Sequence, residues 1–384
     1  MSLEKYAETD VQREVVSLRE SGRSWSDIAK TLNRDIRGLQ RVFRRVEKAA
    51  AVRGYSPEYG MTKPVPSGFN VKGVSTLYDQ DGNMTAQWVK SNADHEARTK
   101  ALLEAIEDSA SGLPKFKPTK PPKQVNDDLA SLLTITDFHL GMRAWAPSDG
   151  EDWDVRIARD VFMNSINDMI AAAPPSGVGI LNQLGDFFHF DSLSPVTPTN
   201  HHLLSNDDRY SKLVELTIAV MTESVHLMLK KFGKVVVVQA EGNHDLASSV
   251  WLRKYIKHRF QDEPRVEVID NEFPYYAYQH GDFMLGFHHG HKMRMTQLQK
   301  LFASEPRFRE MWGLSKYAYL HCGHLHHERV LEDAGCVVEM HPSLSSRDNY
   351  SSSNGYVSQR GAKLITYDKN DGEIHRVTVR PRNG

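Results

Sequence analysis

The sequence is poor in cysteine, has no long apolar run and carries almost no net charge. Its 384 residues include two cysteines, Cys322 and Cys336, which are too few for the disulfide framework of a small secreted protein. No run reaches the roughly 18 apolar residues of a membrane-spanning helix, and the opening segment MSLEKYAETD lacks the apolar stretch of a secretion signal. We therefore expect a soluble cytoplasmic protein with no membrane partner.

A formal net charge of −1 provides no overall attraction to polyanions, so any nucleic-acid binding has to come from local patches. A hydrophobic content of 40% and a charged content of 25% are those of an ordinary globular protein, and the length favours two or three domains. The segment LPKFKPTKPPK is rich in proline and lysine, which predicts a stiff, extended linker. We expect residues 1–53 to form a helical domain, 54–127 a connecting region and 128–384 an α/β domain.

Apolar spacing predicts three helices in the helical domain. The first covers about residues 9–20, the second is Trp25–Leu32 with Ser24 as its N-cap, and the third starts near Asp35. The pattern S-x-x-D-I-A-K-x-L-N before a basic helix resembles a helix-turn-helix, with the third helix in the recognition position.

The third predicted helix carries a positive stripe. Between residues 34 and 53 there are seven positive side chains and two negative ones. We expect DNA phosphate contacts from Arg34, Arg37, Arg41, Arg44 and Arg45. The alternative is a solvated basic face on a small protein-interaction domain, because runs of charge commonly have no other role.

The connecting region is predicted to hold a β-hairpin of Val71–Tyr78 and Met84–Val89, followed by a helix over 93–106. We expect Tyr78 and Trp88 to form a small core in the hairpin, since aromatic side chains usually serve burial. Stacking of these two rings on bases is the alternative.

From about residue 129, hydrophobic strands alternate with helices. Expected strands are Leu132–Thr136, Val178–Leu184, Val235–Ala240, Val266–Ile269, Tyr275–Gln279, Phe283–His288, Tyr317–His321, Arg329–Leu331, Val337–His341, Ala362–Tyr367 and Ile374–Val379. Expected helices are Val155–Ala172, Asp207–Phe232, Val250–Phe260 and Met295–Leu301. The alternation predicts a layered α/β domain with functional residues at the carboxyl ends of strands.

Five hydrophobic runs end in residue types that ligate metals. The segments are Asp137-Phe138-His139, Gly185-Asp186 with His189, Gly242-Asn243-His244-Asp245, His288-His289-Gly290-His291 and Gly323-His324 with His326. In the last segment, two histidines two positions apart on extended backbone place both rings on the same side. Together these segments supply oxygen and imidazole ligands for more than one metal ion.

Two cations about 3.5–4 Å apart share an anionic ligand, and we expect Asp186 to bridge them because a carboxylate offers one oxygen to each. We assign Asp137, His139 and His326 to the first ion, and Asn243, His289 and His324 to the second. Mixed imidazole and oxygen ligands favour Mn²⁺, Fe, Co²⁺ or Zn²⁺ over Mg²⁺ and Ca²⁺.

The ordered set D-x-H, G-D-x-x-H, G-N-H-D, H-G-H and G-H-x-H, spread over about residues 130–345, resembles the calcineurin-like metallophosphoesterase superfamily, closest in kind to Mre11/SbcD-type DNA nucleases. The resemblance does not extend to the first 127 residues. It implies two mixed β-sheets sandwiched between helices in four layers, with two divalent metal ions at the strand ends. Mn²⁺ is the expected metal because nuclease members of the family tend to use it.

The same resemblance implies roles for the other motif residues. His244 contacts the phosphate and assists the leaving oxygen, and Asp245 fixes the tautomer of His244. His189 orients the substrate or the bridging carboxylate, unless it is an ordinary histidine. The family pattern selects His289 as the ligand in its motif, with His288 or His291 as alternatives.

We predict a phosphodiester hydrolase that acts on DNA, exo- or endonucleolytically, with a metal-bridged hydroxide attacking phosphorus. The helix-turn-helix-like segment and the lysine-rich linker favour DNA. The tail segment HPSLSSRDNYSSSNGYVSQRGAKL also favours DNA. It contains four residues that can contact a phosphate backbone or stack on bases: Arg347, Tyr350, Tyr356 and Arg360. The alternative is a flexible loop. Thr197–Asp208 is expected to be a long loop over the site.

Two other functions stay open at this point. One is a nucleotide or small-molecule phosphodiesterase or phosphatase with an N-terminal assembly domain, and the other is a non-enzymatic DNA-binding protein. We expect DNA as the partner and a homodimer, since dimers are common among the nuclease relatives. A DNA-binding unit joined to a nuclease also predicts a role in replication or repair in a phage or mobile element. The protein would then act in the host cytoplasm.

Overall fold

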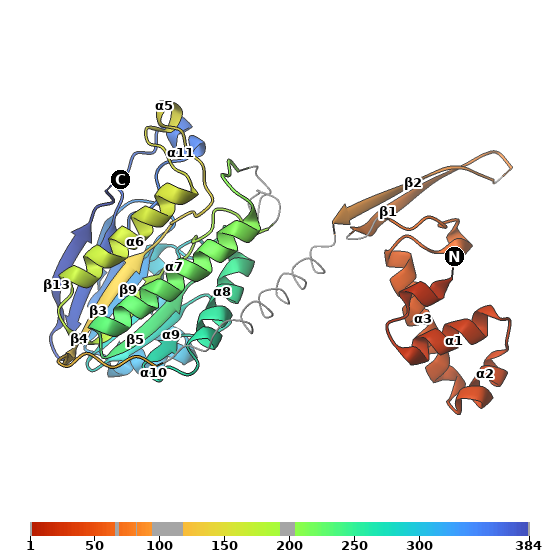
Figure 1. Ribbon diagram of the computed structural model, residues 1–384, viewed down its shortest axis with the longest axis horizontal. Helices are drawn as coiled ribbons and strands as arrows, with labels where there is room; N and C mark the ends of the chain where they lie inside the picture. The colour runs from red at the N-terminus through yellow and green to blue at the C-terminus, as the bar shows by residue number, and fades with distance from the viewer. Residues whose placement is uncertain (1, 66–68, 82, 94–117, 193–203, 383–384) are drawn as a thin grey trace. The chain divides into compact units, whose positions relative to one another are not determined.

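The computed structural model describes residues 2–65, 69–81, 83–93, 118–192 and 204–382. The chain forms two units, Met1–Asp108 and Ser109–Gly384, and each is described by itself (Figure 1). Nearly all of the helix predicted over 93–106 lies outside the described residues, as do much of the predicted linker and more than half of the loop expected over 197–208.

The N-terminal unit contains the three predicted helices. They are α1 (Asp10–Glu20), α2 (Trp25–Leu32) and α3 (Ile36–Val52), preceded by the 3-10 helix η1 (Leu3–Tyr6). Ser24 caps α2 as expected, its side chain accepting a hydrogen bond from the Asp27 amide. Val15, Ile28 and Leu39, one from each helix, are buried together. This small shared core holds the three helices together.

The same unit contains η2 (Pro57–Tyr59) and an antiparallel hairpin of β1 (Phe69–Tyr78) and β2 (Met84–Ala93). The expectation that Tyr78 and Trp88 form a small core is wrong, because their side chains are 61% and 57% exposed. A two-stranded sheet has too little surface to bury large side chains by itself.

The C-terminal unit contains two mixed β-sheets. The six-stranded sheet has the order β13-β12-β3-β4-β5-β6, and the five-stranded sheet has the order β10-β11-β9-β8-β7. The first contains β3 (Asn126–Ile135), β4 (Ser176–Gln183), β5 (Lys234–Gln239), β6 (Val266–Val268), β12 (Ala362–Asp368) and β13 (Gly372–Val379). The second contains β7 (Tyr276–His280), β8 (Phe283–Phe287), β9 (Tyr317–Cys322), β10 (Arg329–Asp333) and β11 (Cys336–Met340). Strands β3 to β6 are parallel, and so are β8, β9 and β11.

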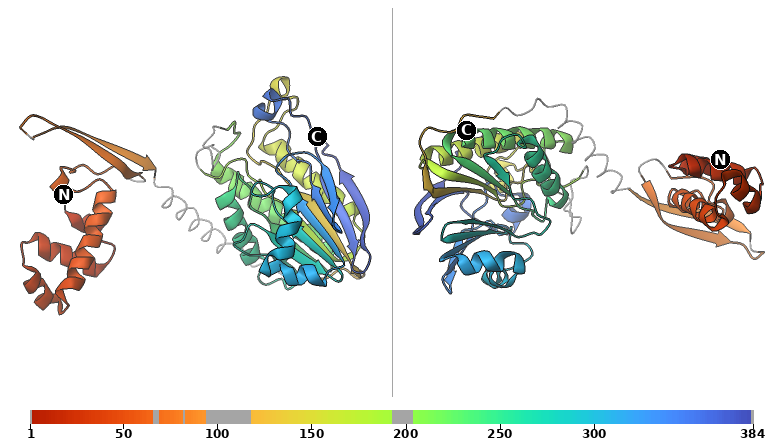
Figure 2. Two further views of the ribbon diagram at one scale, coloured as in Figure 1. Left: turned by 180° about the vertical axis from the view of Figure 1, so that it is seen from behind. Right: turned by 90° about the horizontal axis from the view of Figure 1, so that it is seen from below.

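Helices cover the outer faces of both sheets. The described helices of this unit are α5 (Ala146–Asp149), α6 (Val155–Ala172), α7 (Tyr210–Lys231), α8 (Leu246–Arg259), α9 (Met295–Ser304), α10 (Pro306–Leu314) and α11 (Asn349–Ser353). Helices α6 and α7 lie against the six-stranded sheet with α8 beside α7, and α9 and α10 lie against the five-stranded sheet (Figure 2). The inner faces of the sheets pack on each other, which confirms the predicted α/β fold of two mixed sheets between helices.

Strand β8 shows how the sequence specifies these layers. Phe283, Leu285 and Phe287 are buried in the core between the two sheets, whereas Met284 is buried in the core beneath α9 and α10. Alternate side chains of a strand point to opposite faces, so a strand with a core on each side is hydrophobic at every position. The continuous apolar runs of the sequence therefore mark sheets that are covered on both faces.

The helix predictions fail where the determinants are not local. Helix α10 and the short helices α5 and α11 were not predicted, and α8 begins at Leu246 rather than Val250. The Asp191 carboxylate, from a distant segment, accepts hydrogen bonds from the amides of Ala247 and Ser248 at the start of α8. In the described part of the chain, no helix is both long and apolar enough to cross a membrane.

Candidate metal centre

The predicted ligands lie at the carboxyl ends of five strands. Asp137 and His139 follow β3, Asp186 follows β4, Asn243 follows β5, His289 follows β8, and His324 and His326 follow β9. Because β3, β4 and β5 are parallel, as are β8 and β9, each sheet presents its ligands at one edge. The sequence motifs are thus brought together by the topology of the two sheets.

The backbone at these ligands is strained. Seven non-glycine residues in the described chain have positive φ, and five of them are Asp137, His139, Asp186, His324 and His326. A left-handed conformation costs an ordinary residue about 1–3 kcal/mol and is kept where surrounding structure enforces it, commonly at functional sites. The concentration of strain on these five residues indicates that their side chains are directed to a common point.

The first ligand set is Asp137, His139 and His326, whose donor atoms lie within 4.8 Å of one another. Asp137 Oδ1 is 3.1 Å from His326 Nε2, and the Nε2 atoms of His139 and His326 are 3.3 Å apart. The Asp137 side chain is fully buried. These are the three residues assigned from the sequence to the first ion.

The second ligand set is Asp186, His289 and His324. Asp186 Oδ2 is 3.0 Å from His289 Nε2, and the same nitrogen is 3.9 Å from Asp137 Oδ1. The two sets therefore adjoin at His289. That Asp186 bridges two cations stays a prediction.

Asn243, predicted as a ligand of the second ion, lies between Gly242 and His244. The His244 amide donates to Asp186 Oδ1 over 2.8 Å, so this turn lies against the second ligand set. Asn243 Oδ1 is buried, and no described residue donates a hydrogen bond to it. Buried polar atoms are nearly always paired, so an amide oxygen left in this position fits a cation ligand.

Electrostatics explain why this centre suits cations. Burial alone raises the pKa of Asp137, but His326 and His289 lower it well below its usual value. Burial likewise lowers the pKa of His289, but Asp186 and Asp137 raise it to about 10. Protonated His289 thus neutralises the carboxylates, and a divalent cation between the same groups would do so instead.

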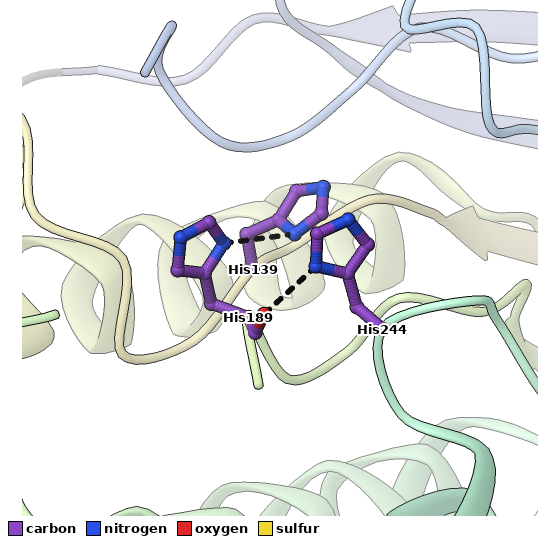
Figure 3. Close-up of side chains that lie close together, drawn as sticks. All are labelled: His139, His189 and His244. Atoms are coloured by element: carbon purple, nitrogen blue, oxygen red, sulfur yellow. Dashed lines mark hydrogen bonds between the residues drawn. The ribbon is translucent and has the colours of Figure 1, made fainter. Parts of the chain in front are cut away.

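Three histidines form a second group at the centre (Figure 3). His189 Nδ1 is 3.4 Å from His139 Nδ1, and the rings of His189 and His244 are stacked with centroids 5.6 Å apart. Burial, and then the charge of His244, lower the pKa of His189 to about 3, so this ring is neutral. His189 thus contacts His139 and His244, and its predicted role in orienting the substrate or the carboxylate of Asp186 stays a prediction.

The prediction that Asp245 fixes the tautomer of His244 is wrong. His244 Nδ1 instead donates to the backbone carbonyl of His189 over 2.8 Å. The buried Asp245 carboxylate accepts hydrogen bonds from the amides of Gly242 and Phe187, at 2.8 and 2.7 Å. Asp245 thus joins the turns that contain Gly242 and Phe187. The carbonyl of His189, rather than Asp245, fixes the tautomer of His244.

The alternatives to His289 have other surroundings. His288 Nδ1 donates to the Pro274 carbonyl over 3.0 Å, and its ring stacks on Tyr275 with centroids 4.2 Å apart. His291 lies beside His289, with ring centroids 5.4 Å apart, outside both ligand sets. Of the three histidines, His289 is the one grouped with Asp186.

Sequence reasoning missed a buried polar cluster near the centre. His321 Nδ1 and His341 Nε2 are 2.9 Å apart, His321 Nε2 is 3.2 Å from the Tyr367 hydroxyl, and Glu339 pairs with Arg376 over 2.6 Å. The pattern of Glu339 and His341 two positions apart, at the end of β11, could have revealed it. The cluster links β9, which carries His324 and His326, to β11, β12 and β13.

The predicted DNA contacts are only partly brought together. Five of the predicted contacts lie on or beside α3 in the N-terminal unit, and all five are exposed: Arg34, Arg37, Arg41, Arg44 and Arg45. Arg347 and Arg360 are half-buried in the C-terminal unit, and the Tyr350 side chain lies outside the described residues.

No protein-family model and no curated protein sequence matches the chain. Among solved structures, it is similar to an archaeal phosphodiesterase (11% identity, TM-score 0.33, 65% of this chain and 99% of that one). It is also similar to Yfce, a phosphoesterase from E. coli (15%, 0.31, 65% and 100%), and to a predicted phosphoesterase from Streptococcus pneumoniae (10%, 0.26, 65% and 98%). At these scores, the function has to be inferred from the geometry of the site.

Gly242→Ala should weaken metal binding, because a Cβ at this position would overlap Asp186 Oδ1. We expect the affinity for Mn²⁺, measured by calorimetry, to fall by about 10–100-fold, the usual effect of disturbing groups that support metal ligands. Gly313→Ala, where a Cβ meets nothing within 4 Å, is the control. Equal affinities of the Gly242→Ala variant and the unchanged protein would contradict this placement of Asp186.

Metal binding should release protons, because the pKa of His289 is raised to about 10 and a cation has to displace that proton. The affinity for Mn²⁺ should therefore be higher at about pH 9 than at about pH 7. Calorimetry in two buffers of different ionisation enthalpy counts the released protons. Binding without proton release at neutral pH would show that the cation does not displace a proton from His289.

Proposed function

We propose that the protein is a divalent-metal-dependent phosphodiester hydrolase acting on DNA. The observation that carries the proposal is the contact between the two ligand sets at His289, beside the group of His139, His189 and His244. Two adjoining sets of mixed carboxylate and imidazole donors suit a pair of cations that clamp a phosphate. Mn²⁺ is the proposed metal, and the donor set also suits Fe, Co²⁺ and Zn²⁺.

Two bound cations would activate a water and neutralise the phosphate oxygens. The chain's own contribution is to position the reacting groups. The carbonyl of His189 accepts a hydrogen bond from His244 Nδ1, which leaves Nε2 as the ring nitrogen that can contact the phosphate. With both ring nitrogens protonated, His244 can pass the proton on Nε2 to the leaving oxygen. His189, neutral and stacked on His244, keeps that ring beside His139 and so beside the first ligand set.

DNA is the proposed substrate because of the N-terminal unit. Its third helix carries Arg37, Arg41, Arg44 and Arg45 at its surface, in an arrangement of three helices that resembles a helix-turn-helix. Arginines along the surface of one helix suit contacts with successive phosphates. A DNA-binding helical unit joined to a phosphodiesterase fits replication or repair in a phage or mobile element.

A substrate panel tests the hydrolase. With Mn²⁺, the protein should cleave labelled DNA, and His244→Gln should reduce the rate by about 10²–10⁴-fold, the usual contribution of a general acid. His258→Gln, an exposed histidine on α8, is the control. Turnover of bis(p-nitrophenyl) phosphate without cleavage of any DNA would favour a small-molecule phosphodiesterase, and no turnover with any metal would contradict both.

The role of α3 is tested by Arg41→Ala and Arg44→Ala. Each should weaken DNA binding, and the slope of log K against log salt should fall by about 1 for each phosphate that the variant no longer neutralises. Fluorescence anisotropy at several salt concentrations measures both quantities. Arg13→Ala on α1, also exposed, is the control, and equal slopes for all variants would assign the basic face of α3 to solvent.

A further inference from the structure

A basic pocket lies in the C-terminal unit, apart from the two ligand sets. It has a volume of about 430 Å³ and is lined by Glu151, Arg347, Ser358, Gln359, Arg360, Arg380 and Pro381. Three of the lining residues are arginines and one is a glutamate. Segments on either side of β12 and β13 and the loop after α5 build the pocket, so its charge is assembled by the fold and is not visible as a run in the sequence.

The arginine side chains of this pocket are held in place. Arg360 Nε donates to the Leu344 carbonyl over 3.1 Å, its guanidinium lies 4.9 Å from the centre of the Trp153 ring, and it pairs with Glu151. Arg380 Nη1 donates to the Arg360 carbonyl over 2.8 Å. The one carboxylate is therefore already paired, and the pocket keeps a net positive charge.

The position of the Arg347 side chain depends on Gly150, the glycine that follows α5. The Arg347 guanidinium lies so close to Gly150 that a Cβ there would overlap Nη2, and Gly150 has a φ of +91°. Glycine at this position thus serves both the backbone turn and the approach of the guanidinium. Arg347 is half-buried and is one of the residues that line the pocket.

A short buried segment joins the pocket to the metal centre. Ser343 Oγ and the Ser345 amide both donate to the carbonyl of Asp137, at 3.0 and 3.3 Å. Arg347 is two residues beyond Ser345, and Arg360 holds Leu344 in between. The segment that leads to Arg347 is thus anchored on the backbone of Asp137, a residue of the first ligand set.

Two exposed aromatic side chains lie close in the chain to residues that line the pocket. Trp145, at the start of α5, is 65% exposed, and Tyr356, two residues before Ser358, is 57% exposed. Helices α5 and α11 lie side by side (Figure 1), where Ser352 Oγ donates to the Asp149 carbonyl over 3.3 Å. Proteins that bind unpaired strands combine exposed rings, on which the bases stack, with positive groups that bind the phosphates.

We propose that this pocket binds a backbone phosphate of single-stranded DNA next to the phosphodiester being cleaved, with a base stacked on Trp145. The inference rests on the proposed function and adds that the strand at the metal centre is unpaired. In a duplex the bases face each other, so an exposed ring would find no base to stack on.

The test compares substrates with and without a flanking phosphate. Arg347→Ala combined with Arg380→Ala should reduce kcat/KM for a single-stranded oligonucleotide about 10-fold relative to kcat/KM for bis(p-nitrophenyl) phosphate, mainly through KM. Trp145→Ala should reduce kcat/KM for the single strand more than for a duplex of the same sequence. Arg382→Ala, whose side chain pairs with Asp168 and lies outside the pocket lining, is the control.

Binding measured without turnover separates the two proposals. Fluorescence anisotropy with a labelled oligothymidine should show weaker binding by the Arg347/Arg380 variant than by Arg382→Ala, with a smaller salt slope. Equal binding and an unchanged kcat/KM ratio would overturn the pocket while hydrolysis still supports the proposed function. Equal losses by Trp145→Ala for single strand and duplex would overturn the assignment to single strands. No hydrolysis of either substrate by the unchanged protein would overturn the proposed function. In that case the anisotropy comparison would still decide whether the pocket binds a phosphate.

Discussion

The C-terminal unit is built around the neutralisation of two buried carboxylates, Asp137 and Asp186. An unpaired charge in a protein interior costs several kcal/mol, so these groups need positive charge within reach. His289 contacts both carboxylates and His326 contacts Asp137. Each of these contacts joins a ligand from one sheet to a ligand from the other. The need to neutralise the carboxylates therefore suits the site to cations and also holds the ligand-bearing ends of the two sheets together.

The strained backbone of the ligands depends on the layers around it. Left-handed conformations at five ligands together cost several kcal/mol, at about 1–3 kcal/mol each. Such a cost is tolerable only on a rigid support, and the supporting strands are buried on both faces, between the opposite sheet and the outer helices. Fold stability and site geometry are therefore linked: the hydrophobic layers maintain a backbone that the ligand residues would not adopt alone.

The sequence predicts the layers and the ligand residues because their signals are local. A hydrophobic run followed by Asp or His gives both a strand and its functional end, as at β3 with Asp137 and at β9 with His324. Interactions between distant segments gave no such signal. The cap of α8 by Asp191, the carbonyl of His189 on His244, and the convergence of Arg347 and Arg380 all join residues that are far apart in the chain.

The exposed Trp88 illustrates the opposite error. Aromatic side chains are usually buried, but this hairpin is too small to bury its rings.

The account depends most directly on two cations held together by the two ligand sets. Anomalous diffraction from crystals grown with Mn²⁺ measures this. The account predicts two peaks about 3.5–4 Å apart, both contacting Asp186. The first should also contact Asp137, His139 and His326, and the second Asn243, His289 and His324. A single peak, or peaks elsewhere in the C-terminal unit, would contradict it.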